Sequence, residues 1–265
     1  MARIHAIANR KGGVGKTTTA INLAASLAAL GRRVLLVDLD PQSNASSGLG
    51  ITGISAEQSV YGALLGQVDP KSLVVATEMK NLSVLPASRD LAAAEVDLVQ
   101  MEHREHRLRQ ALDVVADDFD IVLLDCPPSL GLLTINAFCA SQGVIIPMLC
   151  EYFALEGVSE LVSTIWRVKG FLNPSIEVTG VLLTMYSDRT NHSRSVEDNI
   201  RGYFKHAVYQ TSIPRNVRLA EAPSFGKPAL LHDIKSPGAQ AYLKLAKEFL
   251  ANEKAQGTER ARKGA

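Results

Sequence analysis

The feature that most constrains this chain is a glycine-bearing loop between a short apolar run and an amphipathic helical pattern. Residues 3–9 predict a strand, the loop occupies residues 11–18, and residues 16–30 predict a helix that ends before Gly31. In such an arrangement the backbone N–H groups of the loop point inward, and the helix presents its positive end to the loop. We therefore expect phosphate groups to bind here.

The residue types in the loop indicate which phosphate-containing ligand it would bind. The general phosphate-loop pattern is G-x-x-x-x-G-K-[ST], and Arg10 stands at its first glycine position, so this loop is a variant. We expect Lys16 to bridge the β- and γ-phosphates of ATP, and the Thr17 hydroxyl to bind Mg²⁺. A dinucleotide-binding fingerprint is rejected because Thr18 replaces its third glycine. The nucleotide-binding loop is Lys11, Gly12, Gly13, Val14, Gly15, Lys16, Thr17 and Thr18.

Strand-like and helix-like patterns alternate along the rest of the chain. This alternation predicts an α/β fold, with a doubly wound, mostly parallel sheet flanked by helices. We expect a single domain over residues 1–251 and a disordered charged tail over 252–265. Further strands are predicted at 33–38, 82–86, 121–125, 143–148 and 178–184, and further helices near 90–100, 104–116, 131–140, 156–169, 193–206 and 237–250.

Three aspartates follow predicted strands and are candidates for the chemistry. Asp38 and Asp40 lie two residues apart at one strand end, so their side chains project to the same side. Asp40 would orient the attacking water, while Asp38 would help to hold either the magnesium shell or the loop. Asp125 follows another apolar strand and would reach magnesium, most simply through a water. The expected magnesium ligands, direct or through water, are Thr17, Asp40 and Asp125.

Composition limits the class of protein. Hydrophobic residues make up 46% and the formal net charge is +1, so the whole chain does not have the charge of a nucleic-acid binder. However, residues 52–125 carry an acidic excess and residues 186–247 a basic excess, which could give the folded protein a positive face. The start of the chain reads directly into a strand, without the pattern of a signal peptide, so we expect a cytoplasmic protein. Cys126, Cys139 and Cys150 match no metal or disulfide spacing and are expected to be small core residues.

Several longer motifs carry a family resemblance. The loop itself, the run from Val37 to Gln42 and the run from Leu124 to Ser129 match a deviant Walker A motif, a second acidic motif and a Walker B motif. Residues 150–157 and 213–223 add further matches, so the similarity extends over nearly the whole chain. The chain resembles the ParA/MinD family of P-loop ATPases, in particular the chromosomal ParA, or Soj, type. Arg10 and Ser43 depart from that pattern, where Gln and Gly are usual.

The resemblance assigns roles that chemistry alone leaves open. From its position, Lys11 is either a solvated surface lysine or a cation that neutralises charge on the nucleotide of a second subunit. The resemblance implies the second role, in an ATP-dependent sandwich homodimer. It also implies that Lys11, Lys16 and Asp40 are the catalytic residues, and that Pro214 and Asn216 lie against the adenine.

The resemblance also implies a function in partitioning chromosomes or plasmids. The ATP dimer would bind double-stranded DNA non-specifically through phosphate contacts, at Arg189 and Arg218, and would be nucleoid-associated. A ParB-type activator protein would then stimulate hydrolysis and release.

Three other functions are weighed against this one. An orphan ParA-like ATPase that positions another cargo stays open. A MinD-like division-site ATPase would need bulky apolar residues in a C-terminal amphipathic helix, which residues 251–265 lack, so no membrane partner is expected. An iron–sulfur reductase relative would need Cys126 and Cys139, but neither has the glycine-flanked context of such proteins.

Overall fold

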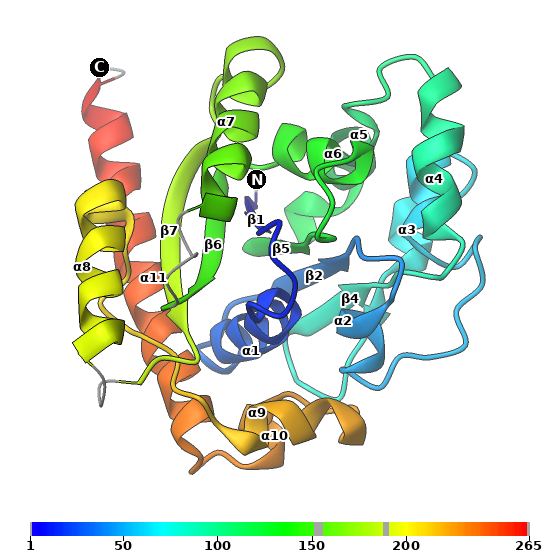
Figure 1. Ribbon diagram of the computed structural model, residues 1–265. Coiled ribbons are helices and arrows are strands. Elements are labelled where there is room, and N and C mark those ends of the chain that lie inside the picture. Colours follow the sequence, from blue (N-terminus) through cyan, green and yellow to red (C-terminus); the bar gives the residue numbers. More distant parts are fainter. Residues whose placement is uncertain (1, 151–155, 188–190, 264–265) are drawn as a thin grey trace.

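A mostly parallel sheet forms the centre of the computed structural model, which describes residues 2–150, 156–187 and 191–263. Its strand order is β3-β4-β2-β5-β1-β6-β7, and only the edge pair β3–β4 is antiparallel (Figure 1). This arrangement confirms the predicted doubly wound α/β fold. The strands are β1 Arg3–Ile7, β2 Val34–Asp38, β3 Val75–Ala76, β4 Leu82–Leu85, β5 Ile121–Asp125, β6 Gly143–Leu149 and β7 Glu177–Thr184.

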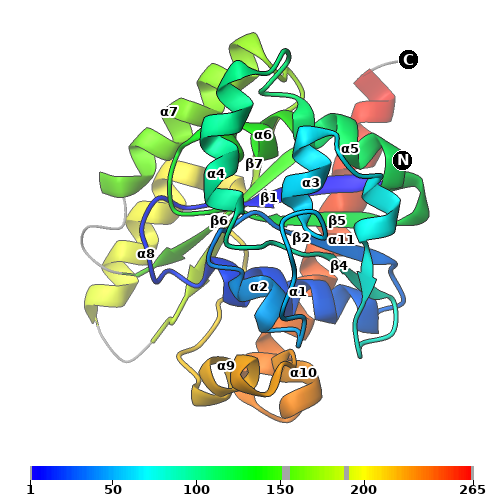
Figure 2. The same cartoon turned by 90° about the vertical axis from the view of Figure 1, so that its right-hand side faces the viewer.

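Helices cover both faces of the sheet and complete three layers. One apolar cluster joins the sheet to α3 Val60–Leu65, α4 Leu91–Asp97, α5 Arg107–Val115, α6 Leu132–Ala140, α7 Glu156–Phe171 and α8 Asn191–Phe204. A second cluster joins the opposite face to α1 Lys16–Ala29, α2 Asn44–Ser47, α9 Val217–Glu221, α10 Ala229–His232 and α11 Pro237–Lys263. Figures 1 and 2 both place α9 and α10 together below α1.

The central strands alternate between these two clusters. In β2, Val34 and Leu36 pack with α1 and α11, whereas Leu35 and Val37 pack with the helices of the other face. Every residue of β2 and β5 is buried, as expected for parallel strands covered on both faces. Helix α1 is buried around most of its circumference because it lies between the sheet and α11.

Several features differ from the sequence expectations, among them the short helices α3, α9 and α10, which were not predicted. The edge strand β3 was not predicted, since two residues are too few for a periodic signal. The polar loop expected at residues 41–60 contains α2. The last helix continues to Lys263, through residues where we expected a disordered tail, because Ala, Glu, Lys, Gln and Arg are good helix formers. Glu253 of this helix lies 3.3 Å from His5 and 3.5 Å from Arg3, which tethers it to β1.

None of the helices in the described ranges has the length and apolar character needed to span a membrane. Cys126 and Cys139 are fully buried, which confirms that they are core residues, and Cys150 is half-buried.

Candidate nucleotide-binding site

The glycine-bearing loop follows β1 and opens directly into α1. Gly13 and Gly15 have φ angles of 71° and 85°, a left-handed conformation that residues with a Cβ rarely adopt. Gly15 is the N-cap of α1 and has no side chain that could cap the first turn of that helix. The first backbone N–H groups of α1 thus keep their capacity to bind an anion.

Hydrogen bonds to other strands fix the position of this loop. Asn9 donates from Nδ2 to the Pro147 carbonyl at 2.7 Å, and its Oδ1 accepts the Lys11 N–H at 3.0 Å. Thr184, at the end of β7, donates from Oγ1 to the Val14 carbonyl at 2.8 Å. Sequence reasoning missed Thr184, although a polar residue that ends an apolar strand is a usable signal. The loop is therefore held by β6 and β7 as well as by its own strand.

Asp38 and Asp125 lie side by side at the carboxyl ends of β2 and β5, where they pair in register. Both are fully buried, but their partners differ. Asp38 accepts hydrogen bonds from the Ser46 N–H at 2.8 Å, the Ser46 hydroxyl at 2.7 Å and the Asp40 N–H at 3.2 Å. These bonds join Asp38 to the segment that follows β2, between Asp40 and Ser46, and not to residues 11–18 of the phosphate loop.

Asp125 has unsatisfied acceptor capacity. Neither of its carboxylate oxygens has a hydrogen-bond partner among the described residues. Burial raises the pKa of Asp125 well above its usual range and the charge of Asp38 adds to the effect, while Thr17 and Lys16 favour the ionised form. A buried carboxylate without donors is suited to a cation or to the water shell of one.

The donor set around Asp125 fits magnesium rather than a metal held only by protein. The described ranges contain no group of three or more His, Cys, Asp or Glu side chains that could hold a metal ion. Mg²⁺ typically takes one or two carboxylates and fills its remaining positions with water and substrate phosphates. Thr17, Asp40 and Asp125 are the residues in this region that could contribute.

The two lysines of the loop have different environments. Lys16 is buried, and this burial lowers its pKa, whereas Asp125, Cys126 and Asp40 raise it. Lys11 is exposed at the outer side of the loop. Arg10, beside it, forms an ion pair with Glu160 of α7. Of these two lysines, Lys16 is therefore the one whose side chain is buried in a single chain.

A pocket of about 360 Å³ adjoins the loop. Gly15 and Thr18 form one side of it, and the segment that leads into α9 forms the other. Pro214 and Asn216 both line this pocket, where the sequence analysis expected the base to lie. The Asn216 Oδ1 atom is buried and has no hydrogen-bond partner in the part of the chain that is described, so it can accept a bond from a ligand.

The residues expected to bind DNA are less clearly arranged. Arg189 lies outside the described residues. Arg218 is exposed but donates to Glu221 at 2.8 Å and lies 3.5 Å from Asp233. Arg201 similarly pairs with Glu197 at 2.7 Å. The basic excess counted along the sequence is therefore partly neutralised within the fold.

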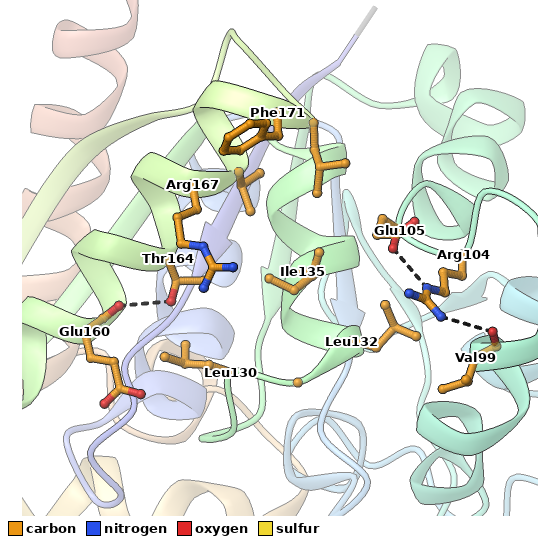
Figure 3. A pocket seen from close by; sticks show the side chains of 13 residues that line it. Val99, Arg104, Glu105, Leu130, Leu132, Ile135, Glu160, Thr164, Arg167 and Phe171 are labelled. Atoms are coloured by element: carbon orange, nitrogen blue, oxygen red, sulfur yellow. Dashed lines mark hydrogen bonds and ion pairs between the residues drawn. The ribbon is translucent and has the colours of Figure 1, made fainter.

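A larger cavity, of about 730 Å³, lies between α6 and α7 (Figure 3). Leu130, Ile135 and Phe171 give it an apolar lining, and Arg104 and Arg167 lie on opposite sides of it. It contains no residue of the phosphate loop, so its size does not make it the nucleotide site.

Comparison with known proteins agrees with this geometry. A family model described as an AAA domain matches residues 2–178, and the chain belongs to that family. Together with the loop, this makes it a P-loop ATPase. The nearby relatives are more specific, and they place the chain in the ParA/Soj group of these ATPases.

Two of these relatives are similar over almost the whole chain. The chromosome partitioning protein ParA of Myxococcus xanthus is 54% identical over 250 residues, covering 94% of this chain and 88% of that protein. The sporulation initiation inhibitor protein Soj of Bacillus subtilis is 54% identical over 252 residues, covering 95% of this chain and 100% of that protein.

A solved structure shares the fold closely. Cobyrinic acid a,c-diamide synthase from Mycobacterium smegmatis, with bound ADP and magnesium, matches with a TM-score of 0.85 and 40% identity, covering 97% of both chains. The same protein has also been solved with an ATP analogue and magnesium. It carries the name of a synthase, so this similarity concerns the nucleotide-binding fold rather than a shared cellular role.

Proposed function

We propose that this protein is a chromosome-partitioning ATPase that binds Mg-ATP at the carboxyl edge of its sheet. The observation that carries the proposal is the meeting of three features at that edge: the uncapped start of α1, the buried Lys16 and the unpartnered carboxylate of Asp125. The names of the ParA and Soj relatives support the partitioning role.

Each residue of the site has a distinct role in this proposal. Magnesium would neutralise phosphate charge, with Thr17 and Asp125 as the residues that hold it and its waters. Lys16 would bind the β- and γ-phosphates from inside the site. Asp40 is half-buried, and its Oδ1 accepts the Gln42 N–H at 3.0 Å within the turn that follows β2. It would therefore orient the attacking water and could also contribute to the magnesium shell.

The base would occupy the pocket beside Pro214 and Asn216. The unpartnered Asn216 Oδ1 atom supports recognition of a hydrogen-bond donor, such as the exocyclic amino group of adenine.

The proposal extends to two chains. Lys11 is exposed at the loop while Lys16 is buried, and this difference supports a role for Lys11 on the nucleotide of a second subunit. The resulting ATP dimer would bind non-specific DNA through Arg189 and Arg218 until a ParB-type partner triggers hydrolysis. We accordingly propose a cytoplasmic protein that associates with the nucleoid and needs no membrane.

A pair of loop variants tests the ATP site. Lys16→Ala should weaken ATP binding roughly 100-fold or more, because a lost charge-assisted contact costs up to about 3 kcal/mol. Lys11→Ala, in the same loop, should bind ATP nearly as the wild type does but should fail to dimerise. Equilibrium binding of a fluorescent ATP analogue and sedimentation velocity measure the two properties. Normal ATP affinity in Lys16→Ala would refute the assignment of the loop.

A further inference from the structure

The wall of the base pocket at the end of β7 is held by side chains that do not line the pocket. Met185 and Pro214 line it, and Tyr186 follows Met185 in the chain and pairs with Pro214. The Tyr186 N–H donates to the Ile213 carbonyl at 2.9 Å, and Tyr186 forms an isolated parallel bridge with Pro214. Met185 has a φ of 49°, unusual for a residue with a side chain, so its neighbours must hold it there.

The Tyr186 side chain connects this wall to α8. Its hydroxyl donates to Glu197 Oε2 at 2.6 Å, and Arg201 Nε donates to Glu197 Oε1 at 2.7 Å. Burial, the largest single influence, raises the pKa of Glu197, but the hydrogen bonds from Tyr186 and Arg201 together lower it below its ordinary value. Glu197 is thus an ionised acceptor that joins the wall to the helix.

Further bonds close a ring around the same segment. Arg201 donates to the Tyr209 carbonyl at 3.3 Å, and the Tyr209 N–H donates to Val181 of β7 at 3.0 Å. The Ile213 N–H donates to the Leu183 carbonyl at 2.8 Å. The segment that carries Ile213 and Pro214 is therefore fixed between β7 on one side and α8 on the other.

We propose that Tyr186, Glu197 and Arg201 are positioning residues of the base pocket, which make affinity for the nucleoside part of ATP depend on the placement of α8. The inference rests on the proposed ATP site. Because the three side chains stand outside the pocket, they act through Met185 and Pro214 and leave the phosphate loop unchanged.

The consequence is a selective loss of affinity. Tyr186→Phe removes one hydroxyl that donates to a carboxylate, and we expect ATP to bind roughly 10-fold more weakly. Inorganic tripolyphosphate with Mg²⁺, which contacts the loop alone, should bind within about twofold of the wild type. Tyr203→Phe is a matched control, because Tyr203 is a half-exposed tyrosine of α8 whose ring packs edge-on against Phe204. It should change neither affinity.

Calorimetric titration of the full chain with ATP and with tripolyphosphate measures both constants, and circular dichroism confirms folding. Glu197→Gln, which keeps the side-chain volume but loses the charge, should show the same selective loss. Equal losses for both ligands, or wild-type ATP affinity in Tyr186→Phe and Glu197→Gln, would overturn the positioning role. A wild-type protein that binds neither ligand would instead contradict the proposed function.

Discussion

At the scale of single residues, hydrogen-bond partners separate the roles of two equally buried aspartates. Asp38 accepts three hydrogen bonds, whereas neither Asp125 oxygen has a partner of hydrogen-bond geometry in the described ranges, although the nearby Thr17 hydroxyl favours its ionised form. Burial raises the pKa of Asp38 to about 6, and the Ser46 bonds oppose that rise. The sequence predicted both carboxylates at the site, but it could not predict this difference. Ser46 lies in the short helix α2, which leaves no periodic signal.

Ser46→Ala tests the structural role of Asp38. The Ser46 hydroxyl donates to Asp38 and also accepts the Ala87 N–H at 3.1 Å, so its removal leaves buried groups without partners. We expect a loss of about 1–3 kcal/mol in the free energy of unfolding. Urea denaturation without nucleotide measures it, with Ser47→Ala as the control, since Ser47 is exposed in the same helix. Equal stability of the two variants would contradict the assigned role.

At the scale of elements, the sequence predicted what periodicity encodes. The buried strands and the helices α1, α5, α6 and α7 were expected close to their observed positions, because long apolar patterns determine them. The contacts that connect the elements were not expected. Thr184 fixes the loop from a strand 170 residues away, and the ring around Tyr186 joins β7, α8 and the segment before α9. Such contacts depend on tertiary packing, which local patterns do not contain.

Thr184→Val tests the connection between β7 and the loop. The variant keeps the side-chain shape but loses the donor to the Val14 and Met148 carbonyls. ATP affinity should fall roughly 5- to 10-fold, because a neutral hydrogen bond contributes about 1–1.5 kcal/mol. Thr179→Val is the control on the same strand, where the hydroxyl lies 3.4 Å from each of its partners, His5 and Val144. If both variants bind ATP equally well, Thr184 does not position the loop.

At the scale of the whole molecule, one chain provides one of the two subunits of the proposed ATP dimer. Lys16 and Asp125 are buried at the proposed nucleotide site, whereas Lys11 is exposed. Internal ion pairs occupy Arg201 and Arg218, so a single chain offers less positive surface than its sequence suggests. DNA binding would then depend on two chains combining their basic residues, which makes association sensitive to both ATP and salt.

In the proposed function, ATP creates a DNA-binding dimer, and Asp40 limits the lifetime of that dimer through ATP hydrolysis. Asp40→Ala should keep wild-type ATP affinity, lose at least roughly 10²-fold in turnover, and accumulate as a dimer on DNA. The most direct measurement is sedimentation velocity of Asp40→Ala with ATP, with and without a non-specific duplex, with Lys16→Ala as the control that stays monomeric. We expect a dimer with ATP that moves with the duplex. A monomer that does not bind the duplex when saturated with ATP would contradict it.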